Sequence, residues 1–172
     1  MNKLILYTNE YNINKECISF LDPVRNKITD GLFAHIIYFG ELFTTNTIHY
    51  SFYLNVVHMG HFFNKNVYKF NPVQNSLVKI KYLESYILTN YGIHMTHSYK
   101  TPRYKIQEIC DSGNIKINTD FTIPANCSTL KLNKYINTNM IFCLKIVGIW
   151  ETDVEYGIIY KFLSLPSPLP LS

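Results

Sequence analysis

The sequence predicts an α+β protein that is mainly β, with a small helix-on-sheet domain followed by a small closed or partly open β-barrel. Its 172 residues are 47% hydrophobic, which is enough for a substantial core. Tyr, Phe and Ile are abundant while alanine occurs only at Ala34 and Ala125, so intrinsic propensity favours strands over helices. After residue 77, turn signals recur about every 10 to 12 residues, as in small barrels and sandwiches.

The N-terminal domain, residues 1–70, contains the clearest helix signal. Asp22 can cap a helix, and Pro23 suits its first position. Apolar residues then recur close to every fourth position, at Val24, Ile28, Leu32, Ile36 and Phe39. This pattern predicts one amphipathic helix from Pro23 to Phe39, with Gly31 as a weak point in its interior.

Strands are predicted to follow this helix. Between Thr47 and Val57 the sequence alternates, and one apolar face is formed by Ile48, Tyr50, Phe52, Leu54 and Val56. Residues 62–70, "FFNKNVYKF", come after Gly60 and have the composition of a partner strand. We therefore expect the first 70 residues to form one helix packed on a small antiparallel sheet.

Residues 71–76, "NPVQNS", mark the predicted domain boundary, because Asn-Pro is followed by polar residues without periodicity. The second domain is predicted over residues 77–163, with strands at 77–88, 91–97, 103–109, 115–123, 140–150 and 156–163. Turns are expected at "NYG", "KTP", "CDSGN", "NKYINTN" and "ETDVEYG". Residues 164–172 carry alternate prolines, which favour an extended, unpaired tail.

The segment "KIKYLESYILTNYGIHMT", residues 79–96, is predicted to form the first hairpin of the barrel. Gly92 supplies the backbone freedom for a tight corner, and Tyr91 beside it is expected on the barrel surface. Together with the preceding Leu77 and Val78, this segment resembles the first hairpin of RNA-binding oligonucleotide-binding (OB) domains of the ribosomal-protein type. The resemblance implies an OB-fold barrel over residues 77–163.

The chain as a whole resembles the stalk subunit of multisubunit RNA polymerases. This family comprises the seventh subunit of nuclear polymerase II, its archaeal counterpart and a small poxvirus form. "CDSGNIKI" is similar to the mid-barrel turn of the viral member, and "NMIFCLKIVGIWETDVEYGIIYKFL" is similar to the closing hairpin of the family. The resemblance implies a non-catalytic polymerase subunit whose tip domain, residues 1–70, docks on the large RNA polymerase subunits. Its barrel is expected to contact nascent RNA.

Basic residues are concentrated in the predicted barrel. From Leu77 to Lys145 the basic residues are Lys79, Lys81, Lys100, Arg103, Lys105, Lys116, Lys131, Lys134 and Lys145, and the acidic ones are Glu84, Glu108, Asp111 and Asp120. Tyrosines interleave with the bases, a mixture that stacks nucleobases and neutralises phosphates. The candidate RNA-binding residues are Lys79, Lys81, Tyr91, Lys100 and Arg103. Because only one of them is an arginine, we expect weak binding without sequence specificity.

No catalytic residue, metal site or cofactor is predicted. The sequence lacks a Gly-rich phosphate loop, a G-x-S-x-G elbow and an H-E-x-x-H motif. Two His-x-x-His pairs, beginning at His58 and His94, have a spacing that points to opposite faces of a strand. Glu151, Asp153 and Glu155 are expected in a solvated hairpin turn, because they lack the glycine and the spacing of a calcium loop.

An intracellular protein is expected. The cysteines Cys17, Cys110, Cys127 and Cys143 lack a C-x-x-C motif and are expected to be reduced. The N-terminus lacks a signal-peptide core, and no apolar run approaches the roughly 20 residues of a membrane span, so no membrane association is predicted. Residue types with AT-rich codons favour a viral protein, which would be cytoplasmic or in the virion; a cellular protein would be nuclear.

Two other functions fit the same sequence. A single-stranded-DNA-binding OB subunit of a telomere or replication complex would use the same basic and aromatic residues, with a preference for DNA. A structural protein of a virion or organelle assembly would bury its tyrosines in an interface. Such a protein would show no salt-dependent binding of nucleic acid.

Overall fold

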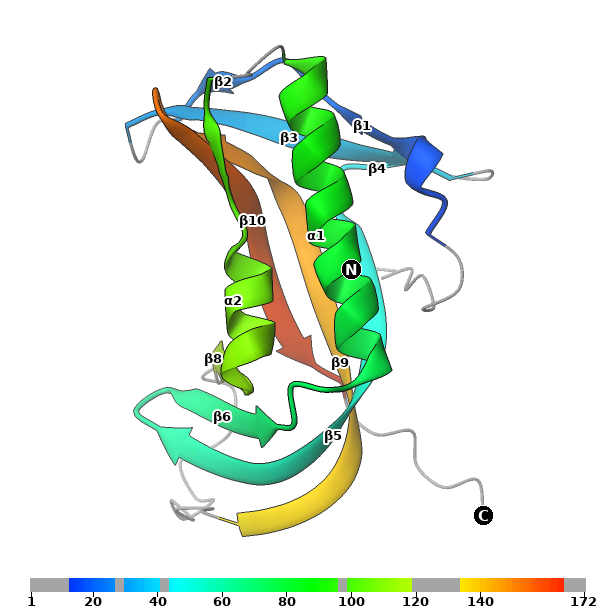
Figure 1. The fold of residues 1–172 in the computed structure, drawn as a ribbon, viewed down its shortest axis with the longest axis vertical. Helices are drawn as coiled ribbons and strands as arrows, with labels where there is room; N and C mark the ends of the chain where they lie inside the picture. The colour runs from blue at the N-terminus through cyan, green and yellow to red at the C-terminus, as the bar shows by residue number, and fades with distance from the viewer. Residues whose placement is uncertain (1–12, 27–29, 41–43, 96–98, 119–133, 166–172) are drawn as a thin grey trace, which may run out of the picture.

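The fold is dominated by strands that join in one sheet, with two α-helices packed on it (Figure 1). The computed structural model describes residues 13–26, 30–40, 44–95, 99–118 and 134–165. In this part of the chain the strands are β1 (Ile18–Phe20), β2 (Val24–Arg25), β3 (Leu32–Phe39), β4 (Thr44–Thr45), β5 (Ile48–Phe62), β6 (Lys65–Phe70), β7 (Thr101–Arg103), β8 (Asn114–Asn118), β9 (Lys134–Glu151) and β10 (Glu155–Ser164). The helices are the 3-10 turn η1 (Lys15–Cys17), α1 (Asn75–His94) and α2 (Lys105–Ser112).

Strand β9 organises the sheet, because it pairs with β3, β5 and β10. The main path runs in the order β1-β3-β9-β5-β6-β8, and β10 also pairs with the short strand β7. All pairs are antiparallel except β7 with β10. The predicted mainly β class is confirmed. The sheet is open, and neither the OB barrel nor the helix-on-sheet tip domain is confirmed.

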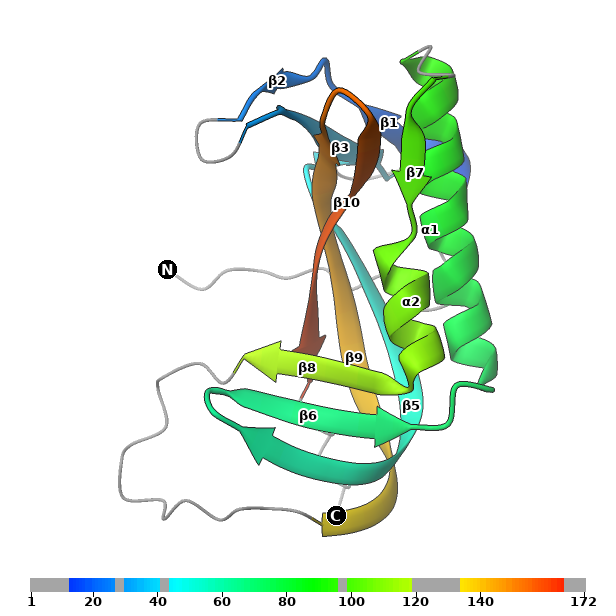
Figure 2. The same cartoon turned by 60° about the vertical axis from the view of Figure 1, so that its left-hand side comes forward.

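A β-bulge between Val56 and His58 bends strand β5, at the point where its register with both β6 and β9 shifts. Beyond this bend, β6 and β8 cross the lower end of the molecule (Figures 1 and 2). The bend brings β8 into contact with β10, although the two strands are not hydrogen-bonded to each other in the described residues. Two strand edges therefore face each other at this end.

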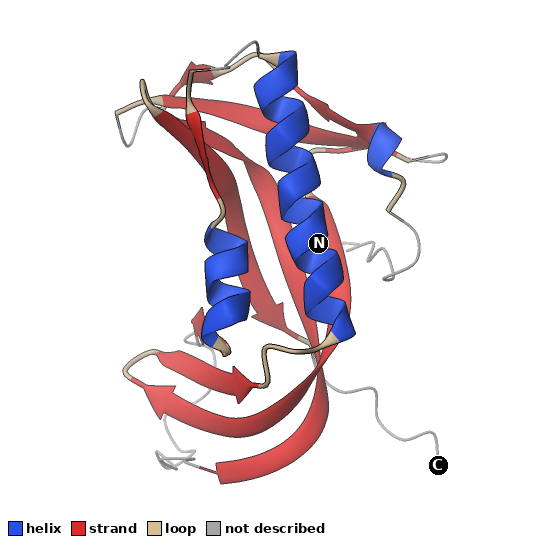
Figure 3. Cartoon of the chain, in the orientation of Figure 1, coloured by secondary structure: helices blue, strands red, loops and turns tan. Residues whose placement is uncertain are grey.

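Both α-helices pack on the same side of the sheet, as Figures 2 and 3 show. The buried residues of α1 recur three and four positions apart, at Leu77, Ile80, Leu83, Glu84, Ile87, Leu88 and Tyr91. They pack against the inner side chains of β5 and β9, among them Phe52 and Phe142, which are completely buried. This spacing gives α1 one continuous core-facing side.

The helix predicted from Pro23 to Phe39 is wrong. Residues 32–39 form β3 instead, and its buried residues, Ala34, Ile36 and Tyr38, alternate with less buried ones. A spacing of four residues fits a strand as well as a helix, because residues separated by an even number lie on the same strand face. Leu32 and Ile36 therefore share one face of β3. Gly31 has a φ of 123°, a value that favours glycine and is incompatible with a helix interior.

The strands predicted at 77–88 and 91–97 are also wrong, because residues 75–94 form helix α1. The "NYG" corner lies inside this helix. Gly92 serves a different purpose there, since a Cβ at this position would lie 2.5 Å from the Tyr156 hydroxyl oxygen. Packing of α1 on the sheet outweighs the strand propensity of its Ile and Tyr residues.

The predictions for the short strands and turns of the second half of the chain have mixed outcomes. Residues 105–112 form α2, where a strand was predicted at 103–109. The "NKYINTN" turn is wrong, because β9 already begins at Lys134. Of the strand predicted at 115–123, residues 115–118 belong to β8, and the remainder lies outside the described residues. The "CDSGN" turn is confirmed, with Gly113 in the left-handed conformation that ends α2.

The strands predicted at 47–57, 62–70, 140–150 and 156–163 are confirmed in β5, β6, β9 and β10. The predicted boundary at residues 71–76 lies between β6 and α1. Strands from both sides of it pair with one another, because β9 joins β3 and β5, and their side chains share one core. The proline-rich tail lies outside the described residues from position 166 onward.

Candidate nucleic-acid interface

The sequence-predicted residues do not gather on one face. Tyr91 is completely buried in α1, so the prediction that it stands on the surface is wrong. Lys100 is also buried, with a side chain that is 7% exposed. Lys79 is exposed on α1, while Lys81 pairs with Asp111 of α2. Arg103, at the end of β7, forms an ion pair with Glu155 at the start of β10.

Tyr91 and Lys100 meet at the carboxylate of Glu151, which is 2% exposed. The Tyr91 hydroxyl donates to Glu151 Oε2 at 2.6 Å, and Lys100 Nζ lies 2.5 Å from Oε1. Burial, followed by the hydrogen bond and negative charge of Glu151, raises the pKa of Tyr91 above its ordinary value of 10. The hydroxyl therefore remains a donor, and the network ties α1 and residue 100 to the end of β9.

A different basic surface lies on β6 and β8. The register places Lys65 opposite Asn118, Val67 opposite Lys116, and Lys69 opposite Asn114. Directly opposed residues share a sheet face, as do residues two apart on one strand. These six residues therefore form one face, which we call the lysine face. The opposite face of the same strands carries the buried Tyr68, Ile115 and Ile117.

A cleft of about 800 Å³ lies between β6, β8, α2 and β10, and every residue of the lysine face except Lys65 lines it. It is lined by Val67, Lys69, Ile109, Ser112, Asn114, Lys116, Asn118, Tyr160, Lys161 and Phe162. Lys69, Lys116 and Lys161 give it a positive charge, and none of the described residues that line it is acidic. On the β10 side, Tyr160 presents a partly exposed ring, and the ring of Phe162, which is only 6% exposed, packs edge-to-face against it. Lysines around an aromatic surface are the combination found where proteins hold single-stranded nucleic acid.

Tyr160 adds a polar group to the cleft. Burial, with smaller contributions from the charges of Glu84 and Glu108, raises the pKa of Tyr160 to about 12. The hydroxyl is therefore protonated at neutral pH and can donate a hydrogen bond. A protonated phenol beside lysine side chains favours an anionic ligand or one rich in acceptors.

The sequence contained a signal for the lysine face. No Asp or Glu occurs between Glu41 and Glu84, a stretch that includes β5 and β6. Lys65 and Lys69 lie before Leu77, outside the predicted barrel. Within the predicted barrel, Lys116 cannot be distinguished by sequence from residues such as Lys81 and Arg103, which form ion pairs. The pairing of β6 with β8, which joins Lys69 to Asn114 across the sheet, is a tertiary feature that no local pattern indicates.

Other chemistries find little support in the described residues. No group of three or more His, Cys, Asp or Glu side chains in them could hold a metal ion. Burial raises the pKa of Cys110 to about 12 and that of Cys143 to about 11, so both thiols are protonated and weakly nucleophilic. Among the helices described, none is long and apolar enough to cross a membrane.

Comparison with known proteins returned no match, whether to a family model, to a curated protein or to a solved structure.

Proposed function

We propose that this protein is a non-catalytic binder of single-stranded nucleic acid, which lies along the lysine face and in the adjoining cleft. The observation that carries the proposal is the grouping of Lys69, Lys116 and Lys161 around Tyr160 and Phe162, with no acidic side chain among the described residues of the lining. Lysines neutralise phosphates, and the partly exposed ring of Tyr160 can stack on a base of any sequence, while the buried Phe162 packs edge-to-face behind it. RNA, the ligand implied by the polymerase resemblance, is the proposed natural strand.

Sequence specificity is expected to be weak. The described lining contains no arginine, the residue that reads bases through paired hydrogen bonds. Asn118 can bind a base edge, whereas the Asn114 amide already donates to the Ser112 carbonyl oxygen at 2.6 Å. Affinity should therefore depend mainly on phosphate contacts and on salt.

Assembly with large RNA polymerase subunits stays a prediction. Residues 139–163, which carry part of the resemblance to stalk subunits, form the β9–β10 hairpin that the resemblance implies. Residues 77–94, which belong to the segment likened to the first OB hairpin, are helical, so that segment gives the OB-fold no support. Among the alternatives, the basic cleft favours a nucleic-acid binder over a purely structural protein.

The proposal is tested with the double variant Lys69→Gln/Lys116→Gln. Binding of fluorescent single-stranded RNA and DNA of mixed sequence is measured by anisotropy over a range of salt concentrations. The slope of log affinity against log salt is negative, and each lost phosphate contact reduces its magnitude by about 0.7 for single strands. We expect the double variant to lose about 1.4 from this slope and to bind both strands more weakly.

The matched control is Lys79→Gln/Arg103→Gln, which removes the same charge from two sequence-predicted residues outside the cleft. It should leave the slope nearly unchanged. An equal effect of both double variants would mean that net charge alone drives binding, and this would overturn the assignment to the lysine face. A wild-type protein that binds neither strand would leave the structural alternative. A clear preference for DNA would favour the replication or telomere class.

A further inference from the structure

The turn between β5 and β6 exposes two adjacent phenylalanines. Phe62 pairs with Lys65 across the hairpin, so Phe63 and Asn64 alone make the turn. Phe62 is 63% exposed and Phe63 is 81% exposed. Their ring centroids lie 4.5 Å apart in an edge-to-face arrangement. The two rings therefore form a small aromatic surface with no cover in the described residues.

The backbone conformation of Phe63 indicates that this residue is not there to stabilise the fold. Its φ is 52°, in the left-handed region that glycine and asparagine adopt readily and that bulky residues rarely do. A glycine would suit this turn better, and the exposed ring gains little from burial. Strained, exposed residues of this kind occur at functional sites more often than elsewhere.

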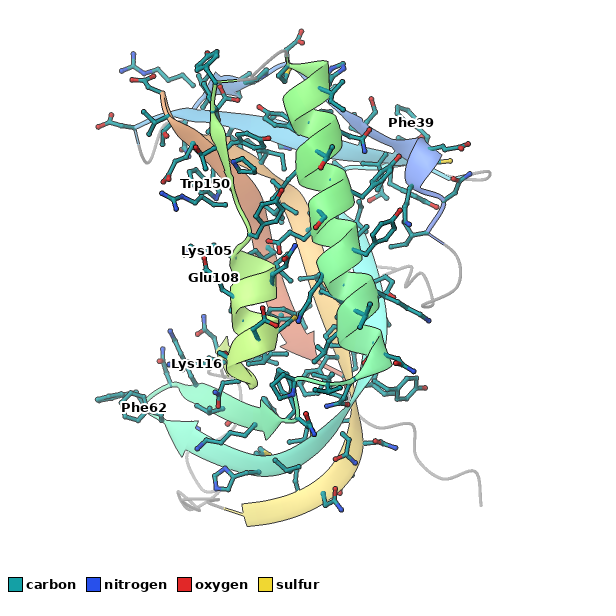
Figure 4. All side chains as sticks on the ribbon, viewed as in Figure 1. Phe39, Phe62, Lys105, Glu108, Lys116 and Trp150 are labelled. Atoms are coloured by element: carbon teal, nitrogen blue, oxygen red, sulfur yellow. The ribbon has the colours of Figure 1, made fainter. Side chains whose placement is uncertain are left out.

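The phenylalanine pair lies at the end of the lysine face. Phe62 shares a sheet face with Lys65, because the two are directly opposed, and Lys65 is opposed in turn by Asn118 of β8. Asn118 also lines the cleft. Figure 4 shows Phe62 projecting from the hairpin on the same side of the molecule as Lys116. A strand that follows the lysines from the cleft would reach these rings.

We propose that Phe62 and Phe63 are a base-stacking site for a nucleobase of the bound single strand. The inference rests on the proposed function and specifies how the site engages bases. The lysines supply phosphate contacts, and the two rings supply a sequence-tolerant stacking surface. The neighbouring lysines favour a strand with a phosphate backbone over an apolar protein surface or a lipid as the occupant.

The test uses the full chain with the double variant Phe62→Ala/Phe63→Gly, in which glycine also relieves the positive φ. Two single strands are compared: one containing the fluorescent base 2-aminopurine, and one abasic at the same positions. Stacking of one base contributes about 5-fold to 150-fold to affinity. We expect wild type to quench the 2-aminopurine, and the variant to quench less and to bind the base-containing strand that much more weakly.

Two features separate stacking from other effects. The variant should keep the wild-type salt slope and bind the abasic strand as well as wild type does. The matched control is Phe39→Ala, which removes another half-exposed ring at the far end of the molecule, and it should change neither affinity (Figure 4). A single cooperative thermal transition of the variant, at a midpoint no lower than that of wild type and followed by the fluorescence of Trp150, checks that the fold is intact.

The outcomes distinguish this inference from the proposed function. If Lys69→Gln/Lys116→Gln weakens binding while Phe62→Ala/Phe63→Gly does not, the stacking site is overturned and the lysine face stands. Equal losses on the base-containing and abasic strands would also overturn stacking, because the rings would then act through the fold. If wild type binds neither strand, both proposals fail.

Discussion

At the scale of single residues, Glu151 is a buried carboxylate that holds two other segments of the chain. Its two oxygens receive Lys100 and Tyr91, which come from different segments, and all three are buried. A buried carboxylate is tolerated only when its charge and its acceptor positions are satisfied. The network therefore orients the end of β9 relative to α1, and removing either Glu151 or Lys100 leaves the other charge without this counter-charge.

Glu151→Gln should destabilise the protein by about 3–5 kcal/mol at neutral pH, because Lys100 would remain buried without its counter-charge. Chemical denaturation followed by Trp150 fluorescence measures this loss.

The matched control is Glu155→Gln, which removes the same charge from an ion pair with Arg103 whose side chains are 27% and 51% exposed. Exposed pairs contribute about 0–1 kcal/mol, so this variant should unfold almost as wild type does. Equal losses in both variants would contradict the role given to the buried network.

At the scale of elements, α2 depends on α1 for its start. The N-cap residue of α2, Tyr104, makes no side-chain capping hydrogen bond. The carboxylate of Glu84, on α1, accepts instead from the backbone N–H groups of Ile106 at 2.9 Å and Gln107 at 2.7 Å. A negative charge at a helix N-terminus is favourable, so Glu84 links the two helices through backbone donors.

Glu84→Gln should destabilise the fold by about 1–3 kcal/mol at pH 7, because an amide has one acceptor oxygen for two backbone donors. Helix content by circular dichroism and denaturant unfolding measure the loss. A variant as stable as wild type would mean that water replaces the lost acceptor.

The pH dependence of this difference has a definite sign. Burial raises the pKa of Glu84 above its ordinary value of 4.5, and the two N–H donors offset part of that effect. A carboxyl group with a raised pKa binds its proton more tightly in the folded state. The stability of wild type relative to Glu84→Gln should therefore rise as the pH falls through the raised pKa, and level off below 4.5. If the relative stability instead decreases as the pH is lowered, the two N–H donors lower the pKa of Glu84 by more than burial raises it.

At the scale of the whole molecule, the described strands form one sheet that crosses the predicted domain boundary. β9 pairs with β3 and β5 from the first half of the chain and with β10 from the second, and α1 packs across them. We expect a single cooperative unfolding transition. Trp150 fluorescence, which reports on β9, and far-ultraviolet circular dichroism, which reports largely on α1, should give coincident curves. Two separated transitions would instead indicate independent domains on either side of residues 71–76.

Local pattern and composition indicated the longest strands. Residues 48–56 alternate between buried apolar and less buried positions, and residues 140–150 and 156–163 are largely apolar runs of strand length, so β5, β9 and β10 could be located without knowing their partners. The helical spacing from Leu77 to Tyr91 is equally present in the sequence. Strand propensity obscured it, since propensity differences are small beside the burial of a whole helix face.

Only the tertiary structure decided which charges are available to a partner. Lys100 and Tyr91 have the composition of a nucleic-acid surface, yet they are buried on Glu151, which is distant in the sequence and reached through the sheet. Lys69 and Lys116 are also far apart in the sequence, and they come together because β6 pairs with β8. Ion pairing and strand pairing join residues far apart in the chain. A charge count can therefore give the sign of a surface, but only the paired sheet shows where that surface lies.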